Sequence, residues 1–194
     1  MKKVILLLIL FTYLLSPHRL SAQVQPSSVP VRPSSAQAQP MPAQDQPAAT
    51  IYPKVVGYMS FIFPIVTINK NETTPNFKNS TTIGFPVGVN VLYSAHFGFS
   101  YEFTPSIVAQ GNTSKTGNLL FDPGPMFRFR RGFTIITRLA FETQGRYGFT
   151  PVFNQVYART KAVNYFVAMS LPTRFGNSLP ASVGASLQFG FIFN

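Results

Sequence analysis

Hydrophobic and polar residues alternate one by one along residues 181–193. The odd-numbered positions are apolar and end in Phe189, Phe191 and Phe193, whereas the even-numbered positions are small or polar except for Ile192. A period of two is that of a β-strand whose two faces meet different environments. Because the apolar face is large and aromatic while the other face is small or charged, the pattern predicts a strand with lipid outside and polar groups inside.

The same alternation recurs throughout the chain after residue 50 and predicts an all-β, antiparallel up-and-down transmembrane β-barrel. The sixth strand is the weakest, since Pro151 near its start cannot donate to a ladder; without it the barrel would have seven strands instead of eight. The length after residue 50 suits eight strands and is too short for a 16-stranded porin. The rival fold is a soluble lipocalin-like barrel, which would need its large residues inside. The predicted strands are 54–68, 81–92, 97–107, 118–129, a fifth beginning at 133, 149–158, 161–173 and 181–193.

The predicted connections alternate between long and short. Polar stretches at 69–80 and 111–117 predict long extracellular loops, and the segments at 94–96 and 130–132 predict short periplasmic turns. With an even number of strands, both ends of the barrel would lie on the periplasmic side.

The N-terminal fifty residues have a different composition. Met1-Lys2-Lys3, an apolar run over 4–15 and a small residue at Ala22 predict a signal peptide over 1–22. The run is too short for a spanning helix, which argues against a retained anchor. Residues 23–50 are rich in Pro, Gln, Ala and Ser and predict a disordered linker, so the domain extends over 51–194.

Charge and cysteine content narrow the chemistry. The formal net charge is +11, and about +8 remains without the predicted signal peptide. Predicted export and apolar strand faces argue against nucleic acid, so an anionic membrane surface is the expected partner. The chain has no cysteine, which excludes disulfides and thiolate chemistry.

Charged residues share the predicted inward face of the barrel. A charge inside a narrow barrel is costly unless it is paired, so we expect an ion-pair network in the lumen. Such a network could be a gated polar pore or a rigid plug, and the narrow interior of an eight-stranded barrel favours the plug. The opposite faces carry Phe99, Phe127, Phe141 and Phe189, which we expect to face lipid. The predicted lumenal charge network consists of Glu102, Asp122, Arg128, Arg138 and Glu142.

No catalytic or cofactor site is predicted. Carboxylates interleaved with arginines are expected to be ionised partners rather than an acid–base pair. His96 is the only histidine after the predicted signal peptide and falls in a predicted turn, so neither a metal site nor a serine–histidine site is expected. The sequence therefore predicts a protein that is not an enzyme and has no cofactor.

The alternating strands and the Phe-rich last strand resemble the small outer-membrane β-barrel proteins of Gram-negative bacteria. The segments RLAFETQGRYGFTPVFN (138–154) and LPTRFGNSLPASVG (171–184) resemble uncharacterised barrels from Bacteroidota. The resemblance implies the outer membrane as location, contact with its lipid and lipopolysaccharide, and insertion by machinery that reads a C-terminal aromatic; here Phe193 is followed by Asn194. The chain has no tryptophan, so tyrosines would form the interfacial girdle. The candidates are Tyr52, Tyr58, Tyr93, Tyr101, Tyr157 and Tyr165.

Three functions are compatible with this pattern. The first is a non-enzymatic contribution to envelope integrity or surface interaction through the loops. The second is a narrow channel for small polar solutes. The third is a lipid-modifying enzyme that would use His96 or an inward carboxylate.

Overall fold

The segments with alternating residues are β-strands in the computed structural model of the protein. The structure describes residues 50–70 and 72–193, so the predicted signal peptide and all but the last residue of the predicted linker lie outside the described residues. The elements are β1 (Lys54–Asn69), β2 (Thr73–Pro75), β3 (Thr81–Gly84), β4 (Val87–Leu92), β5 (Phe97–Gln110), β6 (Thr113–Phe121), β7 (Gly124–Arg128), the 3₁₀ turn η1 (Arg130–Gly132), β8 (Phe133–Glu142), β9 (Arg146–Arg159), β10 (Val163–Ser170), β11 (Thr173–Gly176) and β12 (Ser182–Phe193).

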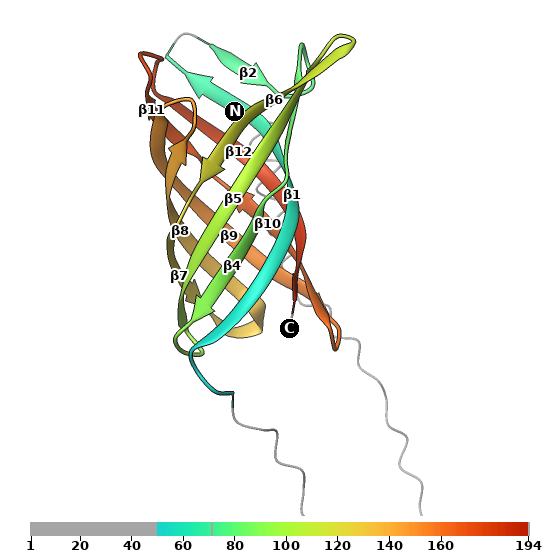
Figure 1. Cartoon of the computed structure of the whole chain (residues 1–194), viewed down its shortest axis with the longest axis vertical. Helices are drawn as coiled ribbons and strands as arrows, with labels where there is room; N and C mark the ends of the chain where they lie inside the picture. The colour runs from blue at the N-terminus through green and yellow to red at the C-terminus, as the bar shows by residue number, and fades with distance from the viewer. Residues whose placement is uncertain (1–49, 71, 194) are drawn as a thin grey trace, which may run out of the picture. The chain divides into compact units, whose positions relative to one another are not determined.

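Hydrogen bonding between β1 and β12 closes the sheet into a barrel. The two strands pair antiparallel from Tyr58 opposite Ile192 to Asn69 opposite Ser182. The ring has eight staves, because β3 with β4, β6 with β7, and β10 with β11 each form one interrupted strand. Figure 1 shows the strands tilted around the barrel axis. The predicted eight-stranded antiparallel barrel is confirmed.

Prolines explain the three interrupted staves. Pro86, Pro123 and Pro172 lie in the breaks between β3 and β4, β6 and β7, and β10 and β11. Proline has no amide hydrogen to donate to a ladder, so a regular strand stops there. Pairing continues around each break through the proline carbonyls. These carbonyls accept hydrogen bonds from Ser60, Leu139 and Gly184 at 2.9, 2.8 and 2.8 Å.

Pro151, which weakened the prediction of the sixth strand, lies inside β9. It is opposite Thr137 of β8, and its carbonyl accepts a hydrogen bond from the amide of Leu171 at 2.9 Å. In an antiparallel ladder the amide and carbonyl of one residue point to the same neighbour. The missing amide of Pro151 therefore faces the break between β10 and β11, where the neighbouring strand is itself interrupted. The sixth strand is confirmed and extends from Arg146 to Arg159.

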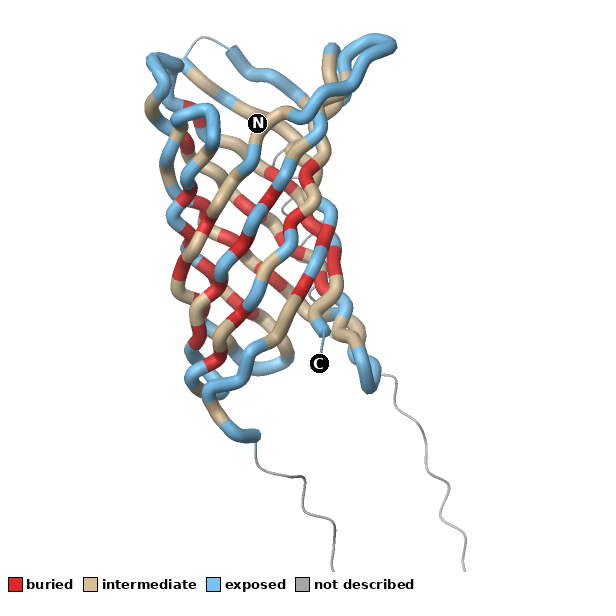
Figure 2. The backbone as a smooth tube through the Cα atoms, viewed as in Figure 1, coloured by how far each residue is buried: buried red, intermediate tan, exposed pale blue. Residues whose placement is uncertain are grey.

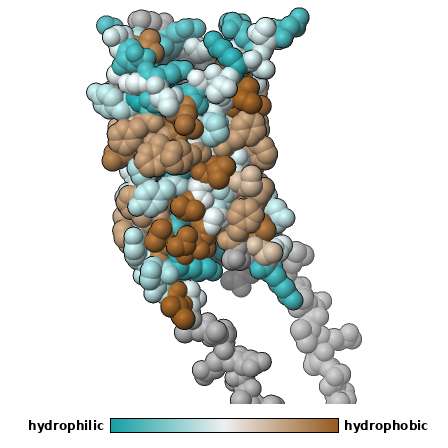
Figure 3. All heavy atoms as spheres, viewed as in Figure 1, coloured by the Kyte–Doolittle hydropathy of each residue, from teal (hydrophilic) through white to brown (hydrophobic). Residues whose placement is uncertain are grey.

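The outer surface of the barrel is apolar and the charged side chains face inward. Leu139 is 58% exposed while its neighbour Arg138 is 3% exposed. Figure 2 shows this alternation of buried and exposed positions along the strands, and Figure 3 shows apolar side chains over the middle of the barrel with polar ones at its upper end. An apolar band of this kind around a closed sheet is the surface of a transmembrane β-barrel. No helix among the described residues is long and apolar enough to cross a membrane.

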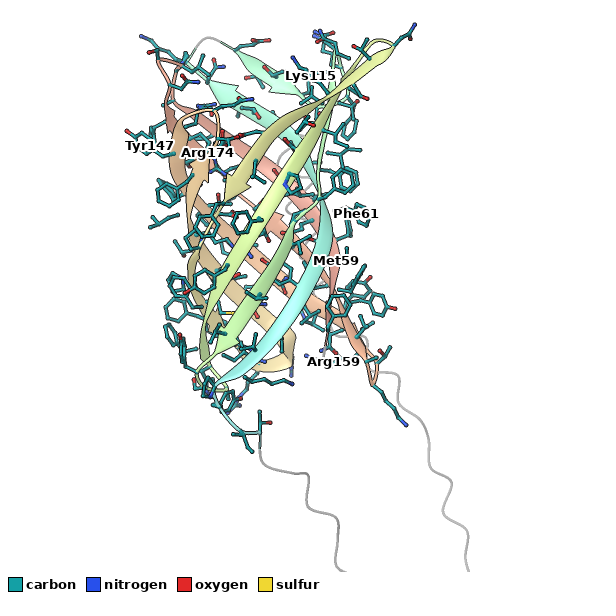
Figure 4. The ribbon with its side chains drawn as sticks, viewed as in Figure 1. Met59, Phe61, Lys115, Tyr147, Arg159 and Arg174 are labelled. Carbon is teal, nitrogen blue, oxygen red and sulfur yellow. The ribbon has the colours of Figure 1, made fainter. Side chains whose placement is uncertain are left out.

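The predicted lipid-facing phenylalanines lie on the outer face. Phe127, Phe141 and Phe189 are exposed there. Phe99 is half-buried on the same face, because its ring packs against that of Tyr101 with centroids 4.9 Å apart. Met59 and Phe61 of β1 also point away from the barrel (Figure 4).

The two ends of the barrel carry different connections. One end, here called the turn end, carries the first residues of β1, the last residues of β12 and the short connections 93–96, 129–132 and 160–162. The other, the loop end, carries 70–80, 111–112, 143–145 and 177–181. The long loop predicted at 111–117 is wrong, because β5 and β6 continue to Gln110 and from Thr113 and leave only a tight turn at Gly111 and Asn112.

Part of the interior is apolar, which the alternation did not indicate. Large side chains from several strands form a buried cluster inside the barrel toward the turn end. Ile192, the exception in the C-terminal pattern, packs against this cluster. The inward face is therefore not uniformly small or charged. The cluster consists of Tyr58, Leu92, Met126, Ile136, Val152, Phe166 and Ala168.

Candidate functional site

A hydrogen-bonded wall of side chains crosses the lumen, and we call it the septum. Its centre is an ion pair between Glu102 of β5 and Arg138 of β8, with Nη1 and Oε2 3.0 Å apart and both side chains 3% exposed. Tyr58 of β1 donates its hydroxyl to the same Oε2 at 2.7 Å and accepts from Nη2 of Arg138 at 2.9 Å. The tyrosine therefore contacts both ends of the ion pair.

Further polar side chains complete the septum and tie it to the closing seam. Gln188 of β12 donates from Nε2 to Ser60 Oγ of β1 at 2.8 Å and to Glu102 Oε2 at 3.3 Å. Thr104 donates to Glu102 Oε1 at 3.2 Å, and Arg138 Nη2 donates to Ser100 Oγ at 3.1 Å. The septum, defined as Tyr58, Ser60, Ser100, Glu102, Thr104, Arg138 and Gln188, joins β1, β5, β8 and β12.

Gly88 makes room for the septum tyrosine. A Cβ built on Gly88 would lie 2.5 Å from the hydroxyl and ring carbon of Tyr58 and would also meet the carbonyl of Tyr101. Only glycine leaves the space that the ring needs at this close approach.

A second ion pair lies on the loop side of the septum. Arg174 of β11 donates from Nε to Glu142 Oε1 of β8 at 2.8 Å, and from Nη1 to Thr150 Oγ1 at 3.0 Å. Nearby, Arg146 donates from Nη2 to Ser182 Oγ at 3.0 Å. Figure 4 shows Arg174 in the loop half of the barrel.

The septum separates two cavities in the lumen. The loop-end cavity has a volume of about 430 Å³ and is lined by Glu102, Asp122, Glu142 and Arg174, among others. The turn-end cavity has a volume of about 370 Å³ and is lined by Lys54, Arg128, Arg131 and Arg159, among others. Arg138, Val152 and Gln188 line both, which places them in the wall between the cavities.

The five residues predicted as a lumenal network all line these cavities, but they do not form one network. Glu102 pairs with Arg138, whereas Glu142 pairs with Arg174. Asp122 is 2% exposed and its Oδ1 has no hydrogen-bond partner among the described residues. Arg128 lines the turn-end cavity only and makes no ion pair within the described part of the chain. The structure thus divides the predicted set between the two sides of the septum.

Three important lumenal residues were missed from the sequence. Arg174 shares the inward parity of Ser170, but the predicted strand ended at 173. Tyr58 was assigned to the interfacial girdle, which is wrong, because it is 4% exposed inside the lumen. Gln188 was placed on the inward face without a role. Tyr52 packs against the interior cluster, while Tyr93, Tyr101, Tyr157 and Tyr165 are exposed, together with Tyr147, which was not a candidate.

The described residues hold no grouping of three or more His, Cys, Asp or Glu that could bind a metal ion. His96 is exposed in the turn between β4 and β5. Its backbone amide donates to Ser94 Oγ at 3.2 Å, and the amide of Phe97 donates to the same oxygen at 3.0 Å. The hydroxyl of Ser94 therefore organises the turn through main-chain contacts.

No protein-family model matches the chain, and no curated protein matches its sequence. Three solved structures share its architecture at low sequence identity. A structure from the de novo design of transmembrane β-barrels is 11% identical with a TM-score of 0.45, covering 71% of this chain and 93% of its own. A de novo designed protein solved by solution NMR is 13% identical with a TM-score of 0.40, covering 74% and 98%. The outer-membrane protein OprG from Pseudomonas aeruginosa is 8% identical with a TM-score of 0.37, covering 72% and 93%. At these identities the likeness concerns the fold alone.

Proposed function

We propose that the protein is a non-enzymatic outer-membrane barrel that is closed to solutes and contributes to envelope integrity or surface interaction through its loops. The observation that carries this proposal is the septum. Seven side chains from four staves fill the lumen between the two cavities, and Tyr58, Gln188 and Arg138 bond directly to the buried Glu102. A wall held by that many mutual contacts is a structural element rather than a loose constriction.

The outer surface supports the proposed location. Exposed Leu139, Phe141 and Phe189 belong to an apolar band that fits the hydrocarbon of a membrane. Exposed Tyr157 and Tyr165 lie near the turn end, where their rings can meet lipid headgroups. Outer-membrane lipid and lipopolysaccharide are the proposed surroundings of the barrel. The insertion machinery is its proposed partner during assembly, through Phe193 near the end of β12.

The second candidate function is a narrow channel, and the two cavities favour it. Each cavity is of small-molecule size, and the septum between them is one layer of side chains. Movement of Arg138 away from Glu102 would connect the two cavities.

Single-channel recording in planar lipid bilayers separates the two candidates. We expect the unmodified protein to show no stable openings, because the septum blocks the lumen. Replacing both charges together, Glu102→Ala with Arg138→Ala, removes the centre of the wall and should produce openings. Lys115→Ala, at the exposed tip of the β5–β6 hairpin, is the matched control and should remain closed. Stable openings of the unmodified protein that change when Arg138 or Glu142 is neutralised would instead establish the channel.

A further inference from the structure

The turn-end cavity is lined by four basic side chains and by no acidic one among the described residues. Lys54 comes from β1, Arg128 from β7, Arg131 from η1 and Arg159 from the end of β9. No ion pair to any of the four is found within the described part of the chain, whereas Arg138 and Arg174 each have a carboxylate. We call this cavity, with its four basic residues, the cationic vestibule.

The local backbone holds two of these arginines together. Arg131 adopts a left-handed conformation with φ 63°, and its carbonyl accepts a hydrogen bond from Gln155 Nε2 of β9 at 2.9 Å. Gly132 follows with φ 82°, and a Cβ there would collide with the guanidinium of Arg159. The turn is thus fastened to β9 in a shape that places Arg159 over Gly132. Like charges held this close repel one another unless an anion lies between them.

The floor of the vestibule contains polar atoms without partners. Asn90 is 5% exposed, lines the vestibule, and its side-chain oxygen has no hydrogen-bond partner. Nε of Arg138, which lies in the wall shared with the other cavity, is also buried and unpartnered. Buried polar atoms are nearly always bonded, so these two indicate that a further polar group belongs in the cavity.

Apolar side chains lie beside these polar atoms. Leu92, Met126, Ile136 and Phe166 belong to the interior cluster and also line the vestibule. A ligand that fills this cavity therefore meets cations at its mouth and apolar side chains deeper inside.

We propose that the cationic vestibule binds a phosphate group carried on a small organic molecule. The planar guanidinium groups of Arg128, Arg131 and Arg159 suit phosphate oxygens because each can donate two parallel hydrogen bonds. The volume of about 370 Å³ lies in the range of small-molecule pockets. The apolar side chains give the organic part a contact surface. This binding is separate from the proposed function, since it does not depend on whether the lumen conducts.

Lipid headgroups and soluble esters both carry phosphate, and the position of the cations distinguishes them. Arg130, in the same turn, does not line the vestibule, whereas Arg131 does. The four vestibule cations are on the lumen side of the wall, away from the lipid that covers the outer face. The structure therefore favours a soluble phosphate ester.

The test is isothermal titration of the folded protein in neutral detergent with phenyl phosphate and with inorganic phosphate. We expect saturable binding at one site, tighter for phenyl phosphate because its ring contacts the apolar side chains. Arg131→Gln and Arg159→Gln should each weaken binding by about tenfold or more, since each removes a charge-assisted contact. The matched control Arg130→Gln removes the same charge from the same turn and should change binding less than about twofold, because an exposed charge outside the cavity acts weakly.

The source of the phosphate is resolved by repeating the titration in nanodiscs. Equal affinity in phosphatidylcholine and phosphatidylglycerol discs supports a soluble ester. Affinity lost only with phosphatidylglycerol means that a lipid headgroup occupies the same vestibule. The proposal is overturned if phenyl phosphate shows no saturable binding in detergent, or if Arg130→Gln weakens it as much as Arg131→Gln does. Unchanged gel mobility of unboiled samples verifies that each variant is folded.

Discussion

Glu102 is the residue on which the septum depends most. Its carboxylate accepts hydrogen bonds from Tyr58, Thr104 and Gln188 in addition to the ion pair with Arg138. Removing a carboxylate from water costs several kcal/mol, and attraction to one cation offsets this only when the remaining lone pairs are also bonded. The complete set of donors explains how this charge is kept inside a barrel of eight strands.

Replacing Arg138 alone should therefore be costly. Arg138→Met leaves Glu102 buried without its cation, in the same cavity wall as Asp122. We expect a loss of about 3–5 kcal/mol in the free energy of unfolding, which is typical when one partner of a buried pair is removed. Urea unfolding in phospholipid vesicles at neutral pH measures this loss.

The double replacement Arg138→Met with Glu102→Gln is the control. It removes both charges and keeps similar volumes, so it should recover most of the lost stability. If the single variant unfolds at the same urea concentration as the unmodified protein, the pair does not stabilise the barrel and the account of the septum is wrong.

At the scale of the strands, the two faces of each stave meet different solvents. Leu139 follows the septum residue Arg138 on β8, so it lies near mid-height on the outer surface. Tyr157 lies near the turn end of β9, close to the last residue of that strand. The two outward positions therefore sample different depths of the same membrane.

An arginine on the outer face should be penalised according to this depth. Leu139→Arg is expected to reduce the folding free energy in vesicles by about 2–4 kcal/mol, because the charge enters hydrocarbon, whereas Tyr157→Arg near the interface should cost about 0–1 kcal/mol. Equal effects of the two substitutions would contradict the assignment of the apolar band to the membrane. Equilibrium folding into vesicles of fixed composition provides the measurement.

Much of this architecture follows from local pattern. Alternation located all eight staves, since the inside and outside of a barrel differ at every strand. The breaks at Pro86, Pro123 and Pro172 were not predicted, because proline interrupts a ladder only where its missing amide would have met a partner. The predicted loop at 111–117 was wrong for a related reason. Polar residues such as Lys115 and Thr116 can continue a hairpin that extends past the apolar band.

The candidate site was only partly predictable. Parity assigned Glu102 and Arg138 to the lumen, but it does not say which side chain lies across from which. The pair joins residues separated by two ladders, and Tyr58 reaches it from β1. Arg174 took Glu142 as its partner through the strand that follows a proline break. Such pairings depend on register and on the space left by residues such as Gly88, which no single strand pattern contains.

At the scale of the whole molecule, the barrel is complete without the N-terminal segment. Every stave from Lys54 to Phe193 pairs with two neighbours inside that range, and β1 closes on β12. The contacts within residues 51–194 form one compact unit. The information for closure is therefore contained in the C-terminal three quarters of the chain.

A chain beginning at Ile51 should fold on its own in detergent. We expect the same β-type circular dichroism and the same faster gel migration of unboiled protein as for a chain beginning at Gln23, since no ladder hydrogen bond is lost. A shortened chain that fails to show the mobility shift, while the longer one shows it, would mean that residues 23–50 take part in closing the barrel.

The septum has a consequence for how such a protein can change. A barrel without a wall is one tube, and a substitution at either mouth alters the same passage. Here the lumen consists of two blind cups placed base to base, and only Arg138, Val152 and Gln188 belong to both. Residues in one cup can be exchanged while the other keeps its shape and charge. The same eight strands can thus carry two recognition surfaces that evolve independently, one on each side of a membrane that neither crosses.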